Sequence, residues 1–256
     1  MGARVFASLE YSKKINRQYT KGLRWFLLAT MFAEAAAEAF AVVAVVYMDE
    51  RLGMKTVEIG VFFMIGIFSL IPGTFLGDFV TARTNPNTSW KLSMLKLKAT
   101  AVVGALTLNK ENIYPGGYIW AVIIGISLGW FYSAEILLFS MCVPQEEGEA
   151  EIAGFYAYCA IILSWLPPLI FSVMVEAEME QSMGVIAVSG FFTIGFLIMS
   201  MASPWEEILE EARSTNQNAT EGKMKENEVV DTSDDSDNDR EDENEKVEVY
   251  LSQTRM

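Results

Sequence analysis

Histidine is absent from the 256 residues of the sequence, and cysteine occurs only twice. Without histidine there is no imidazole base, which excludes Ser-His-Asp and Cys-His nucleophiles and histidine-containing zinc sites. Cys142 and Cys159 lie in or beside apolar runs without a metal-binding spacing, which favours reduced cysteines with a packing role. We therefore expect no enzyme activity, no metal and no other cofactor.

Lysine and arginine are missing from a long part of the chain, since residues 111–212 contain neither. The net charge of −14 comes mainly from the C-terminal segment, because residues 206–256 hold 17 acidic and 6 basic residues. Apolar residues make up 52% of the chain and are concentrated before this segment. The remainder is thus close to neutral and strongly apolar. The expected partners are the lipid bilayer and a small-molecule solute, with no nucleic acid.

Six apolar segments are long enough to cross a bilayer, whose core of about 30 Å needs about 20 helical residues. The third is the weakest, because Lys96 and Lys98 interrupt it, although lysines near a helix end can reach the headgroups. A buried core in a soluble protein is the alternative, but residues 152–175 contain no charged residue. The sequence therefore predicts an all-α polytopic membrane protein with six transmembrane helices, at residues 23–48, 59–80, 92–108, 118–143, 152–175 and 183–202.

The distribution of basic residues predicts the orientation and the domain boundaries. The flanks on one side of the predicted spans hold ten lysines and arginines, against three on the other side. We therefore expect a basic cytosolic flank over residues 1–22, a membrane domain over 23–202, and both termini in the cytosol.

The last segment, residues 203–256, is predicted to be a cytosolic tail. A short amphipathic helix near Trp205 is expected at the membrane surface. The run "DTSDDSDNDREDENE" cannot bury apolar surface and predicts a disordered acidic tail. It is not a calcium loop, because Arg240 and Lys246 replace the glycine and the glutamate that such a loop requires.

Two acids interrupt the first apolar segment within "FAEAAAEAF", residues 32–40. Each carboxylate at bilayer depth costs about 2.5–3.5 kcal/mol on the mildest scale. Glu34 and Glu38 are four residues apart, which predicts one shared helix face directed at protein or water. One interpretation is a substrate or proton pathway in a central cavity. The other is a hydrogen bond to a neighbouring helix that only stabilises the bundle.

A third acid, Glu135, follows three aromatic residues in "GWFYSAEILLF". An aromatic cavity that contains an acid suits a cationic or zwitterionic solute, so Glu135 is a candidate for the same pathway. A hydrogen bond between helices is again the alternative.

Helix contacts and gating are predicted at two places. Gly73 and Gly77 form a small-residue face for close helix packing, and Asp78 follows them at the predicted cytosolic boundary as a candidate latch. Pro167 and Pro168 lie inside the fifth predicted span, where they remove amide donors and kink the helix. Such a break occurs beside transporter cavities and also as a purely structural kink.

The order of a basic flank, an acid-bearing first helix and a "GTFLGD" end to the second resembles the C-terminal six-helix half of a major facilitator superfamily transporter. The stretch "EGEAEIAGFYAYCAIILSWLPPLIFSVM" is similar to the autophagy-related vacuolar amino-acid effluxer family, through Glu149, Glu151, Gly154, Phe155 and Tyr156. That family has about twelve helices, so the resemblance covers only one half. Asp78 also lacks the arginine that usually follows the acid in this superfamily.

The resemblance implies a secondary transporter that exports amino acids such as leucine, isoleucine and tyrosine from the vacuole to the cytosol during autophagic recycling. It also implies a multi-pass protein of the vacuolar or another endomembrane. A half transporter needs a second six-helix half or a second copy. A non-transporting scaffold or accessory subunit, which acts through the acidic tail, is the alternative.

Overall fold

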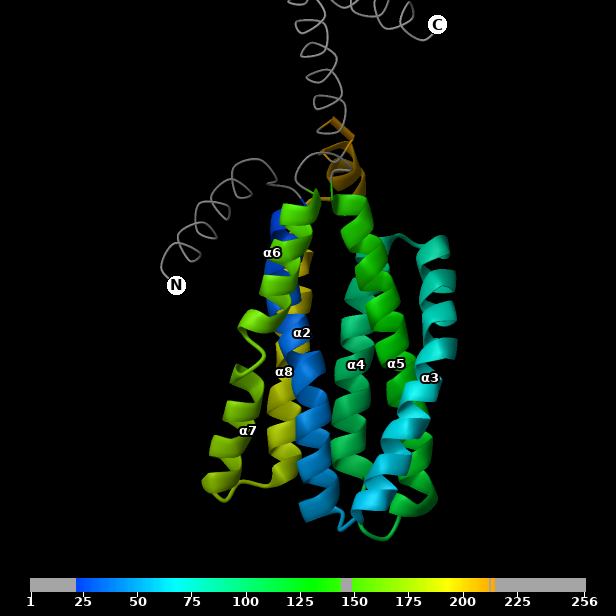
Figure 1. Cartoon of the computed structure of the whole chain (residues 1–256), viewed down its shortest axis with the longest axis vertical. Coiled ribbons are helices and arrows are strands. Elements are labelled where there is room, and N and C mark those ends of the chain that lie inside the picture. The colour runs from blue at the N-terminus through cyan, green and yellow to red at the C-terminus, as the bar shows by residue number, and fades with distance from the viewer. Residues whose placement is uncertain (1–21, 144–148, 212, 215–256) are drawn as a thin grey trace, which may run out of the picture. The chain divides into compact units, whose positions relative to one another are not determined.

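The computed structural model describes residues 22–143, 149–211, 213 and 214. The regular structure of these residues is entirely helical, without a strand, which confirms the predicted all-α class. The chain divides into two units, Met1–Ala212 and Arg213–Met256, and the first contains the helix bundle in Figure 1. The predicted basic flank and almost all of the predicted acidic tail lie outside the described residues.

The first two long helices form a hairpin. Helix α2 spans Leu23–Val46 and continues into the π-helical turn η1, Tyr47–Arg51. Helix α3 follows over Thr56–Arg83. Between them Gly53 takes a φ of 72°, a left-handed conformation that glycine adopts without a steric penalty. At about 1.5 Å per residue, both helices exceed the thickness of a bilayer core.

The next two helices begin at prolines. Helix α4 spans Pro86–Thr107, and the Asn85 side chain caps it by accepting a hydrogen bond from the Thr88 amide at 2.7 Å. Helix α5 spans Ile113–Cys142, but Tyr114 is extended, with a φ of −114° and a ψ of 110°. This is the conformation that a following proline favours, so the regular helix starts after Tyr114.

The fifth predicted span is a broken helix. Helix α6 covers Glu149–Ile162, and α7 covers Leu166–Glu176. Pro167 and Pro168 stand in the first turn of α7, where the missing amide donors carry no cost. In a continuous helix their rings would clash with the carbonyl groups four residues earlier, so the chain leaves the helix at residues 163–165.

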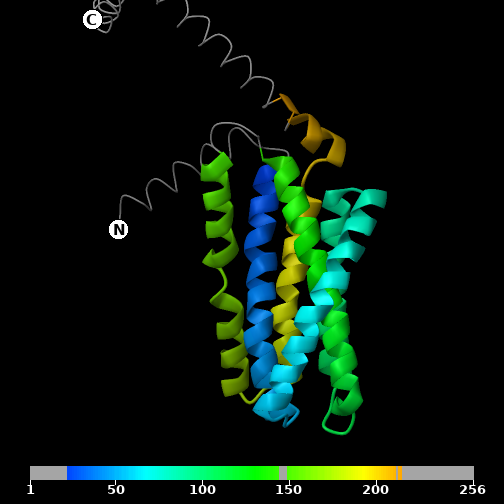
Figure 2. The same cartoon turned by 45° about the vertical axis from the view of Figure 1, so that its right-hand side comes forward.

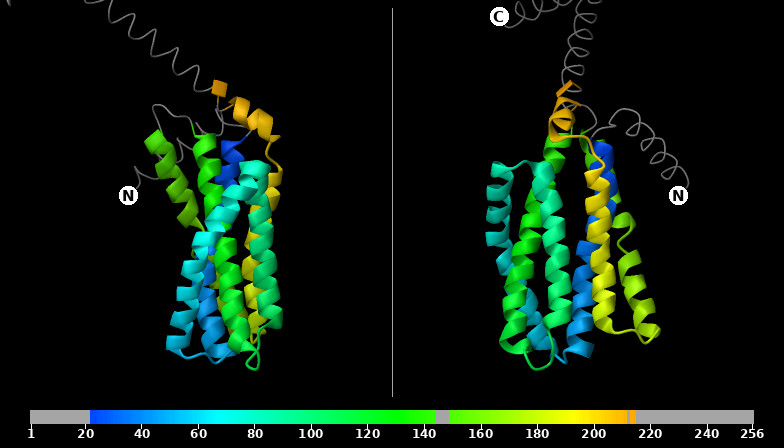
Figure 3. Two further views of the ribbon diagram at one scale, coloured as in Figure 1. Left: turned by 90° about the vertical axis from the view of Figure 1, so that its right-hand side faces the viewer. Right: turned by 180° about the vertical axis from the view of Figure 1, so that it is seen from behind.

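Helix α8, Gln181–Ser200, completes the bundle. It packs against both α2 and α4, whereas α3 packs mainly against α5, and α2 also contacts α6 and α7. In Figure 1, α6 and α7 lie on one side of α2, and α4, α5 and α3 lie on the other. Figure 2 and the two views of Figure 3 show the same pairing from other directions. A short helix at residues 205–211 follows α8.

Five helical segments are long and apolar enough to cross a membrane: Leu23–Arg51, Thr56–Arg83, Gly116–Cys142, Ala150–Glu176 and Gln181–Ser200. The fourth of these includes the proline break. Helix α4 has the length of a span at the position of the third predicted one, but lysines at 91, 96 and 98 lower its apolarity. The described bundle is therefore compatible with a multi-pass membrane protein, with five apolar spans rather than the six predicted.

The outer surface of the bundle is apolar, as a lipid-facing surface requires. On α3, Phe68 and Phe75 are 66% and 70% exposed, and Ile67, Ile71 and Phe79 are exposed as well. Soluble monomers rarely expose contiguous apolar patches of this kind. The bundle therefore places apolar side chains both inside and outside, which is typical of helices in lipid.

Candidate functional site

Two carboxyl groups meet inside the bundle. Glu34 lies in the middle of α2 with 7% of its surface exposed, and Glu135 lies on α5 with no exposed surface. Their side chains lie close enough to interact with each other. The two residues are 101 positions apart in the sequence, so the folding of the bundle creates the pair.

Glu135 is fixed by a third helix. The Tyr156 hydroxyl on α6 donates a hydrogen bond to Oε1 of Glu135 over 3.1 Å. The other oxygen, Oε2, is enclosed and receives no hydrogen bond from a hydroxyl or amide donor. The Thr30 hydroxyl, one turn before Glu34, lies near the Glu135 carboxyl but makes no hydrogen bond of good geometry. The site is thus built from α2, α5 and α6. Oε2 of Glu135 can still accept a hydrogen bond from a bound group.

The charged groups that act on the pair are acidic. Glu38 adds its negative charge to that of Glu34, and the half-buried Tyr132 lies in the field of all three glutamates. Lys96 is directed elsewhere, because its ammonium lies over the Trp130 ring, 5.1 Å from the ring centre. The pair therefore lies where a cation would be attracted.

Glu38 does not share the environment of Glu34. The sequence predicts that the two face the same space, but Glu38 is exposed whereas Glu34 is buried. Four residues of α-helix turn through about 400°, so the two side chains diverge by about 40°. In the described bundle this divergence moves Glu38 from the interior to the outer face of α2, where Ala41 and Val42 are also exposed.

An aromatic cluster covers the pair on the side where α2 begins. Phe139 stacks on Tyr156 with ring centres 4.4 Å apart, and the ring centre of Phe26 lies 6.0 Å from that of Tyr156 and 6.2 Å from that of Phe139. Phe139 lies one helical turn beyond Glu135 in this direction. The cluster of Phe26, Phe139 and Tyr156 therefore separates the carboxyl pair from this end of the bundle.

The helix at residues 205–211 packs over the same end. Ile208 is buried, and its Cγ2 would lie 2.4 Å from a Cβ atom added to Gly22. The Gly22 amide donates a hydrogen bond to Oε2 of Glu211 over 3.2 Å. Sequence analysis expects an interfacial helix here, and the structure shows that its apolar side closes onto the start of α2.

The predicted glycine face lies in the contact between α3 and α5. A Cβ atom on Gly73 would lie 2.4 Å from the Ile126 carbonyl oxygen, and one on Gly77 would lie 3.0 Å from the Trp130 side chain. On the facing helix, a Cβ atom added to Gly129 would lie 2.2 Å from the Leu70 carbonyl oxygen. The backbones of the two helices are thus in direct contact, away from the carboxyl pair.

Asp78 and the two prolines are also separate from the pair. Asp78 is exposed and accepts a hydrogen bond from the Ser133 hydroxyl on α5, rather than pairing with a basic residue. Pro167 is buried and Pro168 half-buried at the break between α6 and α7. Among the predicted site residues, the bundle brings Glu34 and Glu135 together from two different helices.

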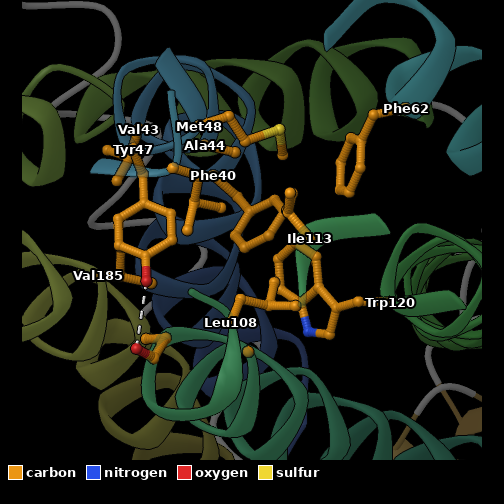
Figure 4. Close-up of a pocket in the computed structure, with 13 residues that line it drawn as sticks. Phe40, Val43, Ala44, Tyr47, Met48, Phe62, Leu108, Ile113, Trp120 and Val185 are labelled. Carbon is orange, nitrogen blue, oxygen red and sulfur yellow. Dashed lines mark hydrogen bonds between the residues drawn. The ribbon is translucent and has the colours of Figure 1, made fainter. Parts of the chain in front are cut away.

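A pocket of about 390 Å³, including its opening, lies near the opposite end of α2 (Figure 4). The Tyr47 hydroxyl donates a hydrogen bond to the Ala105 carbonyl oxygen in its wall, over 3.2 Å. No acidic or basic side chain lines it, so it is distinct from the carboxyl pair. Its wall is apolar and rich in aromatic residues: Phe40, Val43, Ala44, Tyr47, Met48, Leu52, Phe62, Gly104, Ala105, Leu108, Ile113, Trp120 and Val185.

Sequence reasoning did not identify Tyr156 as the hydrogen-bond partner of Glu135, or Thr30 as its neighbour. A tyrosine and a threonine in apolar helices carry no signal of their own, because such side chains also satisfy their hydrogen bonds locally. Among the described residues, no group of three or more cysteine or acidic side chains is arranged to hold a metal ion.

The described residues form an all-helical bundle that is compatible with a multi-pass membrane protein, and it encloses a pair of buried glutamates. No family model matches the chain, and no curated protein or solved structure is significantly similar to it.

Proposed function

We propose that this protein is a secondary transporter, or one half of a transporter, for solutes that carry an ammonium group. The observation that carries the proposal is the buried contact between Glu34 and Glu135 in the middle of an apolar helix bundle. Acids at membrane depth are costly, and they typically mark ion or solute pathways.

The surroundings of the pair favour binding over a purely structural role. A structural carboxylate in a membrane bundle is expected to have a cationic partner or a full set of donors. Here the neighbouring charge comes from Glu38, and Oε2 of Glu135 has no hydroxyl or amide donor. An ammonium group supplies both the positive charge and the missing N–H donors.

The specific solute and location follow from the family resemblance. On that basis, the protein exports amino acids from the vacuole to the cytosol in autophagic recycling, with both termini in the cytosol. Helix α4 then serves as a sixth span, in which its lysines reach the headgroups or pack on aromatic rings. A second six-helix half or a second copy of the chain covers Glu38, whose exposure on the outer face of α2 would otherwise be costly in lipid.

Reconstitution of the full chain in liposomes tests the proposal, with uptake of radiolabelled leucine as the readout. Glu34→Gln and Glu135→Gln should each abolish uptake, because the amide preserves the shape but removes the charge. Glu176→Gln, at the exposed end of α7, is the matched control and should leave uptake unchanged. Wild-type rates in both site variants would refute the proposal.

The acidic composition of residues 206–256 favours one alternative, a scaffold that acts through its tail. Deletion of residues 214–256 distinguishes the two functions. A scaffold loses its partners in this variant, whereas a transporter retains its flux.

A further inference from the structure

We propose that the apolar pocket at the η1 end of α2 binds one acyl chain of a membrane lipid (Figure 4). Of its lining residues, Phe40, Leu108 and Trp120 are half-buried and the others are buried. This inference is independent of the proposed transport, because none of the acids assigned to the solute lines the pocket. It requires only that the bundle lies in a bilayer.

The wall of the pocket has no free hydrogen-bond donor for water or for a polar ligand. The Tyr47 hydroxyl donates to the Ala105 carbonyl oxygen over 3.2 Å, and Nε1 of Trp120 donates to the Thr100 carbonyl oxygen over 3.1 Å. These are the two side-chain donors among the lining residues. Apolar cavities of this kind stay dry and take apolar ligands. A free amino acid would have to leave its charged groups there without partners, at a high cost.

The π-helical turn η1 keeps charge out of the wall. In an α-helix, the residue four positions after Tyr47 would follow it on the same face, and that residue is Arg51. Instead the Leu52 amide donates a hydrogen bond to the Tyr47 carbonyl oxygen, five positions earlier, over 3.2 Å. Leu52 therefore joins the wall, and the exposed Arg51 forms an ion pair with Glu180 over 2.5 Å. Such π-turns are frequent at functional sites.

Aromatic rings form one side of the pocket. The ring centres of Phe40 and Phe62 each lie 5.7 Å from that of Trp120 (Figure 4). Gly104 allows the indole of Trp120 to lie directly on α4, because a Cβ atom there would overlap it. Flat rings offer contact along a chain of methylene groups, each of which contributes about 0.8 kcal/mol when it is buried.

The surroundings of the pocket favour a lipid as the source of the chain. Leu108 is the last wall residue of α4 before the exposed polar turn at residues 109–112. The wall therefore reaches the surface beside this turn. On the outside, Leu106 is 68% exposed next to Ala105 of the wall, and Val61 is exposed next to Phe62. A lipid with its headgroup at the polar turn thus has its chains beside the pocket.

Photolabelling of the full chain in lipid nanodiscs tests the site. The probe is phosphatidylcholine with a diazirine in the middle of one acyl chain. Adducts are expected on Tyr47, Phe62 and Val185, which line the pocket and are too buried to meet lipid outside the bundle. Phe75 on the outer face of α3 should be labelled as well and serves as the reference. Labelling of Phe75 without adducts on the three buried residues would overturn the proposal.

Variants that fill the pocket test whether the adducts arise inside it. Ala44→Leu and Ala105→Val add methyl groups to the wall from α2 and α4, so adducts on the buried residues should fall several-fold in each. Ala41→Leu enlarges an exposed position of α2 and should leave them unchanged. Pocket adducts that persist in both filling variants would contradict the proposal. Excess leucine should not alter the labelling of wild-type protein, and its suppression would assign the pocket to the solute instead.

Thermal unfolding in detergent measures binding without photochemistry and shows that each variant is folded. A ligand that binds only the folded state stabilises it, so phosphatidylcholine should raise the melting temperature of delipidated wild-type protein and of Ala41→Leu. The rise should be smaller in Ala44→Leu and Ala105→Val, where the pocket is partly filled. An equal rise in all four proteins would place the bound lipid on the outer surface alone and overturn the pocket site.

Discussion

The hydroxyl of Tyr156 lies 3.1 Å from Oε1 of Glu135 and donates a hydrogen bond to it. The same tyrosine ring stacks on Phe139. One residue of α6 therefore orients the buried acid with its hydroxyl and covers it with its ring. The two roles are separable, because phenylalanine keeps the ring and removes the hydroxyl.

We predict that Tyr156→Phe weakens the site without disrupting the bundle. A hydrogen bond to a charged group contributes about 1.5–3 kcal/mol, so its loss should reduce leucine affinity about tenfold or more. Tyr158→Phe changes an exposed tyrosine on the same helix and serves as the control. Binding and flux measured in the same liposomes would check the prediction, and equal values for the two variants would contradict it.

Gly73→Ala should destabilise the contact between α3 and α5. The new methyl group would lie 2.4 Å from the Ile126 carbonyl oxygen, so the backbones must separate. Overpacking of this kind typically costs about 1–3 kcal/mol.

Gly60→Ala is the matched control for this change in the same helix. It has open space around the new Cβ atom and should be neutral or stabilising by up to about 1 kcal/mol. Thermal unfolding in detergent measures the difference, and equal melting temperatures would show that close backbone packing is unimportant.

Thiol labelling should distinguish water from lipid at exposed positions, in a background with Cys142 and Cys159 replaced by alanine. Ala41→Cys lies one turn beyond Glu38 on the exposed side of α2 and should react with a membrane-impermeant maleimide. Phe75→Cys lies on the apolar outer face of α3 and should not react. If Ala41→Cys resists the reagent in every condition, this face of α2 does not border an aqueous pathway.

Ile208→Ala should release the helix at residues 205–211 from the bundle. Truncation of a buried isoleucine to alanine costs about 2–5 kcal/mol of stability. A helix of only seven residues is not expected to stay packed on the bundle after this loss. Leu209→Ala changes a half-buried neighbour and should have a smaller effect. Hydrogen exchange of the amides at 205–211 should rise in the first variant only. Unchanged exchange in Ile208→Ala would show that another contact holds this helix.

The helices themselves were predictable, because their apolar runs and proline boundaries are local features. The charge of Lys96 explains why the third span is less apolar than the others, and its position over Trp130 could not be read from the sequence. The break at Pro167 was predictable for the same local reason, since a missing amide donor acts on its own helix.

The site was predictable only in its parts. The sequence shows that Glu34, Glu38 and Glu135 are unusual in apolar helices, but it does not show which of them meet. Contact between Glu34 and Glu135 depends on the rotation of α2 and α5 about their axes, which packing with other helices determines. The same rotation exposes Glu38, which the spacing of four residues alone assigned to the interior.

The contact of Gly22 with Ile208 and Glu211 has a consequence for biogenesis. A ribosome makes α2 before the other described helices and residues 205–211 after them, so the start of α2 must wait for its covering segment while α3 to α8 are synthesised. Nascent chains arrested before residue 205 should therefore expose Gly22 to proteases, and quality-control factors would be able to recognise an unfinished copy at this point.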